Sequence, residues 1–293
     1  MRRRADRPAR AKDESGSSSG DSAIAAFIGA GAVAATFFAL TIAESRRPLR
    51  LTRESRTRRI ARNLGTGALS AVAVTLLGPL LQKPLLARAE RQNLGLLRVV
   101  RLPRPFRLAA GVLLLDYTLW WWHWLNHESP ALWRFHLVHH VDRDLDTSTA
   151  VRFHFGEMLL SVFWRMAQIR LLGVDREALA IWQKLLMISI LFHHSNLRLP
   201  ESFEKQLVKF VVTPRMHGIH HSDVAAETNS NWSSLLSVWD RLHGTYRSEP
   251  RQDDITIGVP AWSRSEEVTF GRIQAMPFRT QRDDWRGSER RTG

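Results

Sequence analysis

Long apolar runs alternate with basic segments through the first half of the chain. The first run, residues 23–43, has no charged side chain over about the 20 residues that a membrane-spanning helix requires. A second run, residues 64–86, contains Gly78 and Pro79, which membrane helices tolerate. A third, residues 108–125, ends in tryptophans that suit an interfacial belt: Trp120, Trp121, Trp122 and Trp124. The pattern predicts three membrane helices.

The rest of the pattern divides the chain into four parts. Residues 1–22 are charged and rich in Ser and Gly, which predicts a disordered basic tail. We expect transmembrane helices and basic loops over 23–107, a catalytic domain over 108–250 and a polar C-terminal tail over 251–293. Runs 157–172 and 177–192 contain charges and suit spans, a hairpin dipping into the bilayer, or buried amphipathic helices. The predicted fold class is all-α, an integral-membrane helical bundle.

Charge refines this picture. The chain has 42 Lys and Arg against 28 Asp and Glu, a net charge of +14, and the basic residues gather around the apolar runs. That placement favours anionic lipid over nucleic acid as the partner. The arginine-dense loop 46–62 favours the cytoplasmic side under the positive-inside rule, and three spans would put the first histidines there too. We expect a bacterial-type inner (plasma) membrane protein with its site on the cytoplasmic face.

The histidines are strongly clustered. None precedes residue 123, and eleven of the twelve lie between 123 and 221. They form the spacings HxxxH, HxxHH and HxxHH. On a helix, the first and last histidines of HxxHH face the same way and the middle one points about 100° aside, which suits two ions held between the same helices. Eight residues are the predicted metal ligands: His123, His127, His136, His139, His140, His217, His220 and His221.

Cysteine is absent, so thiolate ligands and iron–sulfur clusters are excluded and any metal takes nitrogen or oxygen ligands. His194, which closes an apolar helix, is a predicted ninth ligand. Ligating imidazoles usually donate their other N–H to a carboxylate or carbonyl, and Glu157 could accept it. His243 is expected to be structural. Five residues are candidates for a further ligand or for such a hydrogen-bond partner: His193, His154, Asp116, Asn196 and Asp240.

The order of DYTLWWWHWLNH, FHLVHH, LFHHSNLRLP and TPRMHGIHHS closely resembles the fatty acid hydroxylase superfamily, which includes the sterol desaturases. The resemblance covers roughly residues 108–260. It implies an integral-membrane oxygenase with two histidine-bound iron ions, O₂ as oxidant, an external electron-transfer protein and a C–H bond of a membrane lipid as target, hydroxylated or desaturated. The resemblance implies that the eight histidines of the HxxxH and HxxHH spacings, which we call the box histidines, are metal ligands, together with His194.

The sequence departs from that family's pattern at a few positions, and these bear on substrate choice: Phe155, Asn229, Trp232, Ser233 and His243. Two other functions stay open. Two ions could activate water for lipid hydrolysis, although such sites normally include bridging carboxylates. The chain could also be a non-enzymatic membrane metal-binding protein. The same histidines would accept zinc, and nothing in the sequence indicates the substrate or the oligomeric state.

Overall fold

The computed structural model describes residues 18–90 and 95–285, and most of the predicted tail 1–22 lies outside them. The described chain is helical and contains only isolated β-bridges, so the all-α prediction is confirmed. The α-helices are α1 Ser18–Arg46, α2 Arg56–Glu90, α3 Leu96–Val99, α4 Arg104–Glu128, α5 Pro130–His140, α6 Phe155–Leu172, α7 Arg176–His194, α8 Glu201–Leu207, α9 Pro214–His220, α10 Ala225–Thr228, α11 Val238–Leu242 and α12 Phe270–Ala275. The 3₁₀ turns are η1 Thr147–Val151, η2 Gln252–Asp254, η3 Pro260–Trp262, η4 Ser265–Val268 and η5 Met276–Phe278.

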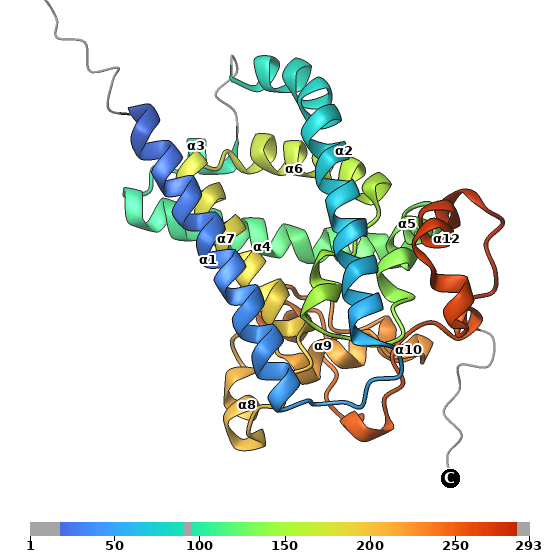
Figure 1. Cartoon of the computed structure of the whole chain (residues 1–293). Coiled ribbons are helices and arrows are strands. Elements are labelled where there is room, and N and C mark those ends of the chain that lie inside the picture. Colours follow the sequence, from blue (N-terminus) through green and yellow to red (C-terminus); the bar gives the residue numbers. More distant parts are fainter. Residues whose placement is uncertain (1–17, 91–94, 286–293) are drawn as a thin grey trace, which may run out of the picture.

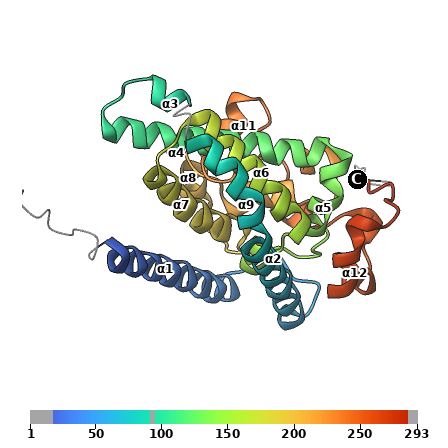
Figure 2. The same cartoon turned by 90° about the horizontal axis from the view of Figure 1, so that it is seen from above.

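Five long helices form the main body of the described chain. α4 packs against α6 and α7, α2 lies across α6, and α1 runs along α7 (Figures 1 and 2). Between α4, α6 and α7 the apolar side chains of Leu115, Leu172 and Trp182 form a buried cluster. Two histidine-bearing helices, α4 and α7, are therefore joined to α6 by a packed apolar layer.

Local sequence signals set the ends of the histidine helices. Pro130 opens α5 and Pro214 opens α9, at the first helical position, where the missing N–H of proline costs no hydrogen bond. The Thr213 side chain caps α9 by accepting from the Met216 N–H. Gly173 ends α6 in the left-handed conformation, at φ 65°.

The C-terminal part differs from the predicted polar tail. Residues 252–285 contain η2 to η5 and α12, and they cover α5 (Figure 1). Val259, Ile273 and Met276 pack in one cluster with Leu137 and Val138 of α5, and all five are buried. Apolar residues scattered in the sequence thus meet on one helix, so this segment belongs to the packed structure.

Only part of the membrane prediction is supported. Among the described residues, one stretch, Arg56–Leu81 of α2, is long and apolar enough to cross a membrane, and it overlaps the predicted run 64–86. The helix α4, which contains the predicted run 108–125, does not have the combination of length and apolar composition that crossing a membrane requires. The interfacial role expected of Trp120 is wrong, because this side chain is 3% exposed and donates its Nε1–H to Asp240 at 2.9 Å.

The arginine-rich loop between α1 and α2 is attached to the histidine-bearing region. The Leu49 N–H donates to the Asn196 carbonyl at 2.7 Å, and the Arg198 N–H donates to the Arg47 carbonyl at 2.8 Å. Farther along, the backbone N–H groups of Arg53 and Glu54 both donate to the Asp144 carboxylate at 2.9 Å. The loop and the histidines therefore lie on the same side of the molecule.

Candidate metal centre

Nine of the twelve histidines gather into two groups of ligand atoms. The first group brings together five residues from α4, α5 and α9: His123, His127, His136, His140 and His220. The second takes four from α5, α7 and α9 with its C-cap: His139, His194, His217 and His221. Within each group the ligand nitrogens all lie within 4.8 Å of one another. These nine are the predicted eight box histidines together with His194.

The two HxxHH blocks share their members between the groups in opposite ways. In α5 the first and last histidines, His136 and His140, join the first group and His139 joins the second. At α9 the first and last, His217 and His221, join the second group and His220 joins the first. This is the division that the helical spacing predicts, and it places the two groups side by side, with the His140 and His221 rings stacked 4.4 Å apart.

Several of these imidazoles have their Nδ1–H group occupied. His136 donates to the Glu157 carboxylate at 2.9 Å, as predicted, and this carboxylate is buried. The others donate to oxygen atoms of loops or helices: His123 to Trp232, His127 to Asn229, His139 to Arg152, His194 to Ile190 and His220 to Ser230. When Nδ1 carries the proton, Nε2 presents a lone pair, the form in which neutral imidazole binds a metal.

The distances between Nε2 atoms fit a bound cation. His194 Nε2 lies 3.0 Å from His139 Nε2 and 3.0 Å from His217 Nε2. Because His139 and His194 both donate from Nδ1, two lone pairs face each other across this gap, which a cation between them relieves. Nitrogen ligands about 2.1 Å from one ion lie about 3.0 to 3.4 Å from each other. In the first group the buried Nε2 of His127 and that of His220 have no hydrogen-bond partner among the residues that the structure describes.

Burial keeps these imidazoles neutral. Desolvation, with a smaller contribution from neighbouring histidines, lowers the pKa values of His139, His140 and His221 well below the ordinary 6.5. Burial also lowers the pKa of His194, to about 3, and its hydrogen bond to the Ile190 carbonyl opposes that shift only in part. Neutral imidazoles are ready to bind a metal near pH 7 without first losing a proton.

A buried ionic cluster that we did not predict packs against α5, next to the histidine groups. Asp142 lies 3.6 Å from Arg59 and 3.0 Å from Arg62. Burial alone would raise the pKa of Asp142, but Arg59, Arg152 and Arg62 lower it to about 2. Arg152 donates to the Val138 carbonyl at 2.8 Å, and its own carbonyl accepts from His139. The sequence signal was the pairing of the arginine-rich loop with the DRDLD stretch after the second histidine box.

Three candidates serve the fold rather than the ligands. His154 caps α6, accepting from the Gly156 N–H at 2.9 Å, and its other nitrogen donates to the Gln274 carbonyl. Asp116 accepts from the Trp239 indole at 2.6 Å and from the Leu236 N–H. Asn196 is paired in both directions with the Arg50 backbone. Each of the three binds a loop or a helix end, and none belongs to either histidine group.

Two further candidates lie next to the groups. Asp240 contacts no ligand histidine directly; it accepts from the Trp232 and Ser233 N–H groups at 2.9 Å and so fixes the loop whose Trp232 carbonyl accepts from His123. His193 belongs to neither group, although its ring centroid is 4.1 Å from that of His217. As expected, His243 is structural, because it stacks on Trp120 at 4.0 Å.

A cavity of about 850 Å³ opens onto both histidine groups. Its wall is largely apolar and comes from α2, α4, α6 and α7, with side chains such as Val74, Leu119 and Met187. His123 and His136 of the first group and His194 of the second lie in the same wall. Its size is within the range of small-molecule sites, and its apolar wall suits a hydrocarbon chain.

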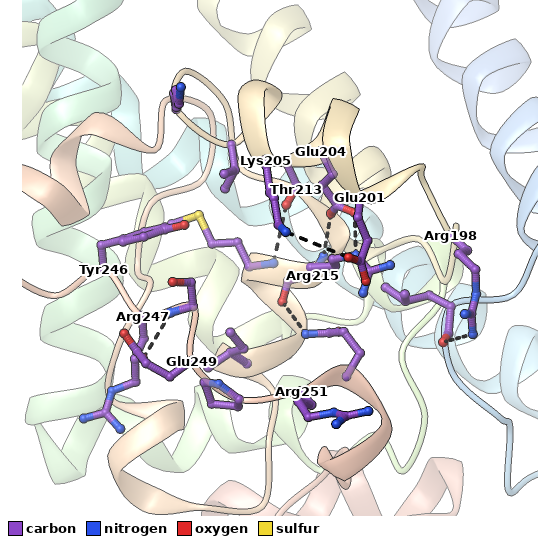
Figure 3. A pocket seen from close by; sticks show the side chains of 18 of the residues that line it. Arg198, Glu201, Glu204, Lys205, Thr213, Arg215, Tyr246, Arg247, Glu249 and Arg251 are labelled. Atoms are coloured by element: carbon purple, nitrogen blue, oxygen red, sulfur yellow. Dashed lines mark hydrogen bonds and ion pairs between the residues drawn. The ribbon is translucent and has the colours of Figure 1, made fainter.

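A second pocket, of about 600 Å³, differs in chemistry (Figure 3). It lies between α8, α9 and residues 246–253, and its lining includes seven basic and four acidic residues. Some are paired, such as Arg215 with Glu204 at 2.8 Å (Figure 3). No ligand histidine lines it, so this polar pocket is separate from the apolar cavity.

The described chain is all-helical, and it gathers nine histidines into two groups that could each hold a metal ion, beside an apolar cavity. Residues 108–245 match the model of the fatty acid hydroxylase family. The ornithine lipid hydroxylase OlsE of Rhizobium tropici is 33% identical over 158 residues, which cover 54% of this chain and 46% of that protein. The family model and the curated relatives identify residues 108–245 as a domain of the fatty acid hydroxylase superfamily.

More distant relatives extend the comparison. The alkylglycerol monooxygenase of Xenopus tropicalis is 25% identical over 55% of this chain and 35% of its own length. The cholesterol 25-hydroxylase of Mus musculus is 27% identical over 49% of this chain and 48% of its own. The matched region thus spans about half or less of each of these relatives. No solved structure gives a significant match.

Proposed function

We propose that the chain is a membrane-bound di-iron oxygenase that hydroxylates or desaturates a C–H bond of a lipid. The observation that carries this proposal is the apolar cavity whose wall contains histidines of both groups. The relatives' names, which describe hydroxylases and a monooxygenase of lipids and a sterol, support lipid hydroxylation as the general activity. We assign the metal site to the cytoplasmic face of the inner membrane. The reason is the arginine-rich loop next to the site, because loops rich in arginine favour the cytoplasmic side.

In this proposal the nine grouped histidines hold two iron ions. Bound iron would supply the activation of O₂. The protein's own groups do the rest: Glu157 and the loop carbonyls orient the imidazoles through Nδ1, which leaves each Nε2 directed inward. The walls of the cavity exclude water and hold the hydrocarbon chain in one position, which determines which carbon reaches the centre.

An external carrier supplies the electrons in this proposal, because the chain has no cysteine for an iron–sulfur cluster. The polar pocket of Figure 3 offers a docking place close to the metal groups. Met216 lines it, and the next residue, His217, belongs to the four-histidine group. The excess of basic side chains favours an acidic carrier.

The test of this function is a product analysis. The purified protein is loaded with iron and given a reducing system, O₂ and a membrane lipid extract. The molecular masses of the lipids are then measured by mass spectrometry. Hydroxylation adds about 16 mass units and desaturation removes about 2, in each case with O₂ consumed. Cleavage of lipid without O₂, by zinc-loaded protein, would contradict the oxygenase and support a hydrolase.

A further inference from the structure

A single arginine interrupts the apolar wall of the large cavity. Arg165 of α6 lies half-buried among the lining residues, at a place where the neighbouring helices contribute mainly apolar and aromatic side chains. Its guanidinium stacks over the Trp182 ring, 4.1 Å from the centroid. A guanidinium group remains charged at neutral pH, so the cavity contains a fixed positive charge that the histidine site does not use.

No acidic side chain among the described residues forms an ion pair with Arg165. Its one protein hydrogen bond there runs from Nη1 to Gln168 Oε1 at 2.6 Å, and Gln168 in turn donates to the Leu115 carbonyl of α4 at 3.2 Å. The guanidinium group is therefore held in place from two sides, by Trp182 and by Gln168. Most of its five N–H donors have no acceptor in the described protein.

A second donor lies in the wall of the same cavity. The buried Nε1–H of Trp164 has no hydrogen-bond partner among the described residues, although its ring packs against Trp122 at 5.4 Å. A buried donor without an acceptor is costly, and two donors in one cavity wall, one of them charged, can bind the acceptor oxygens of an anion.

We propose that Arg165, aided by Trp164, binds the anionic head group of the lipid substrate, a carboxylate or a phosphate, inside the large cavity. Arginine matches the planar oxygen pairs of both groups. This inference rests on the proposed function only in taking the cavity as the substrate site. It adds the class of substrate: an amphiphile with one negative end and a hydrocarbon chain.

The position of Arg165 also limits where the chain is attacked. Glu157, which hydrogen-bonds His136, lies on the same helix eight residues earlier, about 12 Å along its axis at 1.5 Å per residue. A head group held at Arg165 therefore leaves the metal groups facing a carbon well along the chain, and a carbon next to the head group stays out of reach.

Binding of defined probes tests the proposal without turnover. Hexadecanoate, hexadecyl phosphate and methyl hexadecanoate have similar chains and differ in head group. Equilibrium dialysis against the full chain in a neutral detergent, above pH 7, gives the affinity for each. We expect one or both anions to bind at least about tenfold more tightly than the neutral ester, as charge-assisted hydrogen bonds provide. The tighter of the two anions identifies carboxylate or phosphate as the preferred group.

Variants locate the effect. Arg165→Gln should weaken anion binding by about tenfold to a hundredfold and leave the neutral ester within about twofold, whereas Arg165→Lys keeps part of the preference. Arg104→Gln is the matched control, because it removes the same charge from an exposed side chain paired with Glu177. Equal binding of acid and ester by the wild type, or a preference that survives in Arg165→Gln, would overturn the proposal. Because these assays need no turnover, a failed oxygenase test leaves their result unchanged.

Discussion

Each candidate ligand depends on the atom that holds its other nitrogen. A histidine that donates from Nδ1 is fixed in rotamer and tautomer, and its Nε2 then points to the ion. His136 is the one that uses a carboxylate, Glu157, for this purpose. A carboxylate also raises the basicity of the imidazole, so we expect Glu157 to increase metal affinity through His136.

The Glu157→Gln substitution tests that role. Glutamine keeps a hydrogen-bond acceptor of similar size and removes the negative charge, so we expect iron affinity to fall by about tenfold to a hundredfold while the protein stays folded. Iron titration with a chelator competitor measures the affinity, and circular dichroism reports the fold. Glu201→Gln, at an exposed position on α8, is the control. Unchanged iron affinity would show that Glu157 has no such role.

Stability of the metal-free protein should depend on pH with a definite sign. Burial lowers the pKa values of His139, His140, His217 and His221 in the folded state, whereas in the unfolded chain they return to about 6.5. The unfolded state therefore binds more protons below that value, and the free energy of unfolding falls as the pH drops below about 6.5. Urea unfolding at several pH values measures this. A constant or rising stability on acidification contradicts it.

The sequence predicts the candidate ligands better than it predicts their hydrogen-bond partners. Ligand spacing is a local property of one helix, so the boxes and their division between two groups could be predicted from HxxHH alone. The partners of the ligands come from distant loops. Asp116 was a candidate for a further ligand or for a hydrogen-bond partner of a ligand, yet it binds the α11 region instead. Arg152 accepts from His139 through its backbone carbonyl, and a backbone contact cannot be predicted from the residue type.

At the scale of elements, α9 is held by a contact that only glycine allows. Arg50 enters from the loop between α1 and α2 and donates to the Pro214 carbonyl at 2.6 Å and to Gln252 Oε1 at 2.8 Å. A Cβ on Gly218 would lie 1.7 Å from Arg50 Nη2. The loop, α9 and η2 are thereby joined at one buried guanidinium group, beside two candidate ligands.

The Gly218→Ala substitution should break this junction. Arg50 is buried and cannot move aside without losing its hydrogen bonds, so we expect a loss of about 2 kcal/mol or more in the free energy of unfolding and weaker metal binding. Thermal unfolding and metal content are the measurements. Gly271→Ala in α12 is the matched control, because its Cβ would meet nothing within 4 Å. Equal melting temperatures for the two variants would contradict this account of α9.

At the scale of the whole molecule, both ends of the described chain fold back onto the histidine helices. The sequence did not indicate this for the C-terminal part, because its apolar residues have neither helical nor strand periodicity. Val259, Ile273 and Met276 become a core only against Leu137 and Val138. Membrane helices, in contrast, can be predicted from length and composition alone. Among the described residues, α2 contains a stretch that is long and apolar enough to cross a membrane.

The Ile273→Ala substitution tests whether the C-terminal segment supports the metal site. Ile273 is fully buried, and truncating such a side chain costs about 2–5 kcal/mol. Thermal unfolding should show a lower melting temperature, with metal loss at the same transition because α5 carries three candidate ligands. Leu51→Ala, at a side chain that is 94% exposed, should leave the melting temperature unchanged. A similar result for both variants would mean that the segment is dispensable.

The central claim is that one chain holds two metal ions, one in each histidine group. Metal analysis of the iron-loaded protein measures this directly, in the wild type and in His139→Ala, His220→Ala and His243→Ala. The account predicts about two irons per chain in the wild type and in His243→Ala, loss of the second group's iron in His139→Ala and loss of the first group's iron in His220→Ala. Full iron occupancy in both His139→Ala and His220→Ala would contradict it.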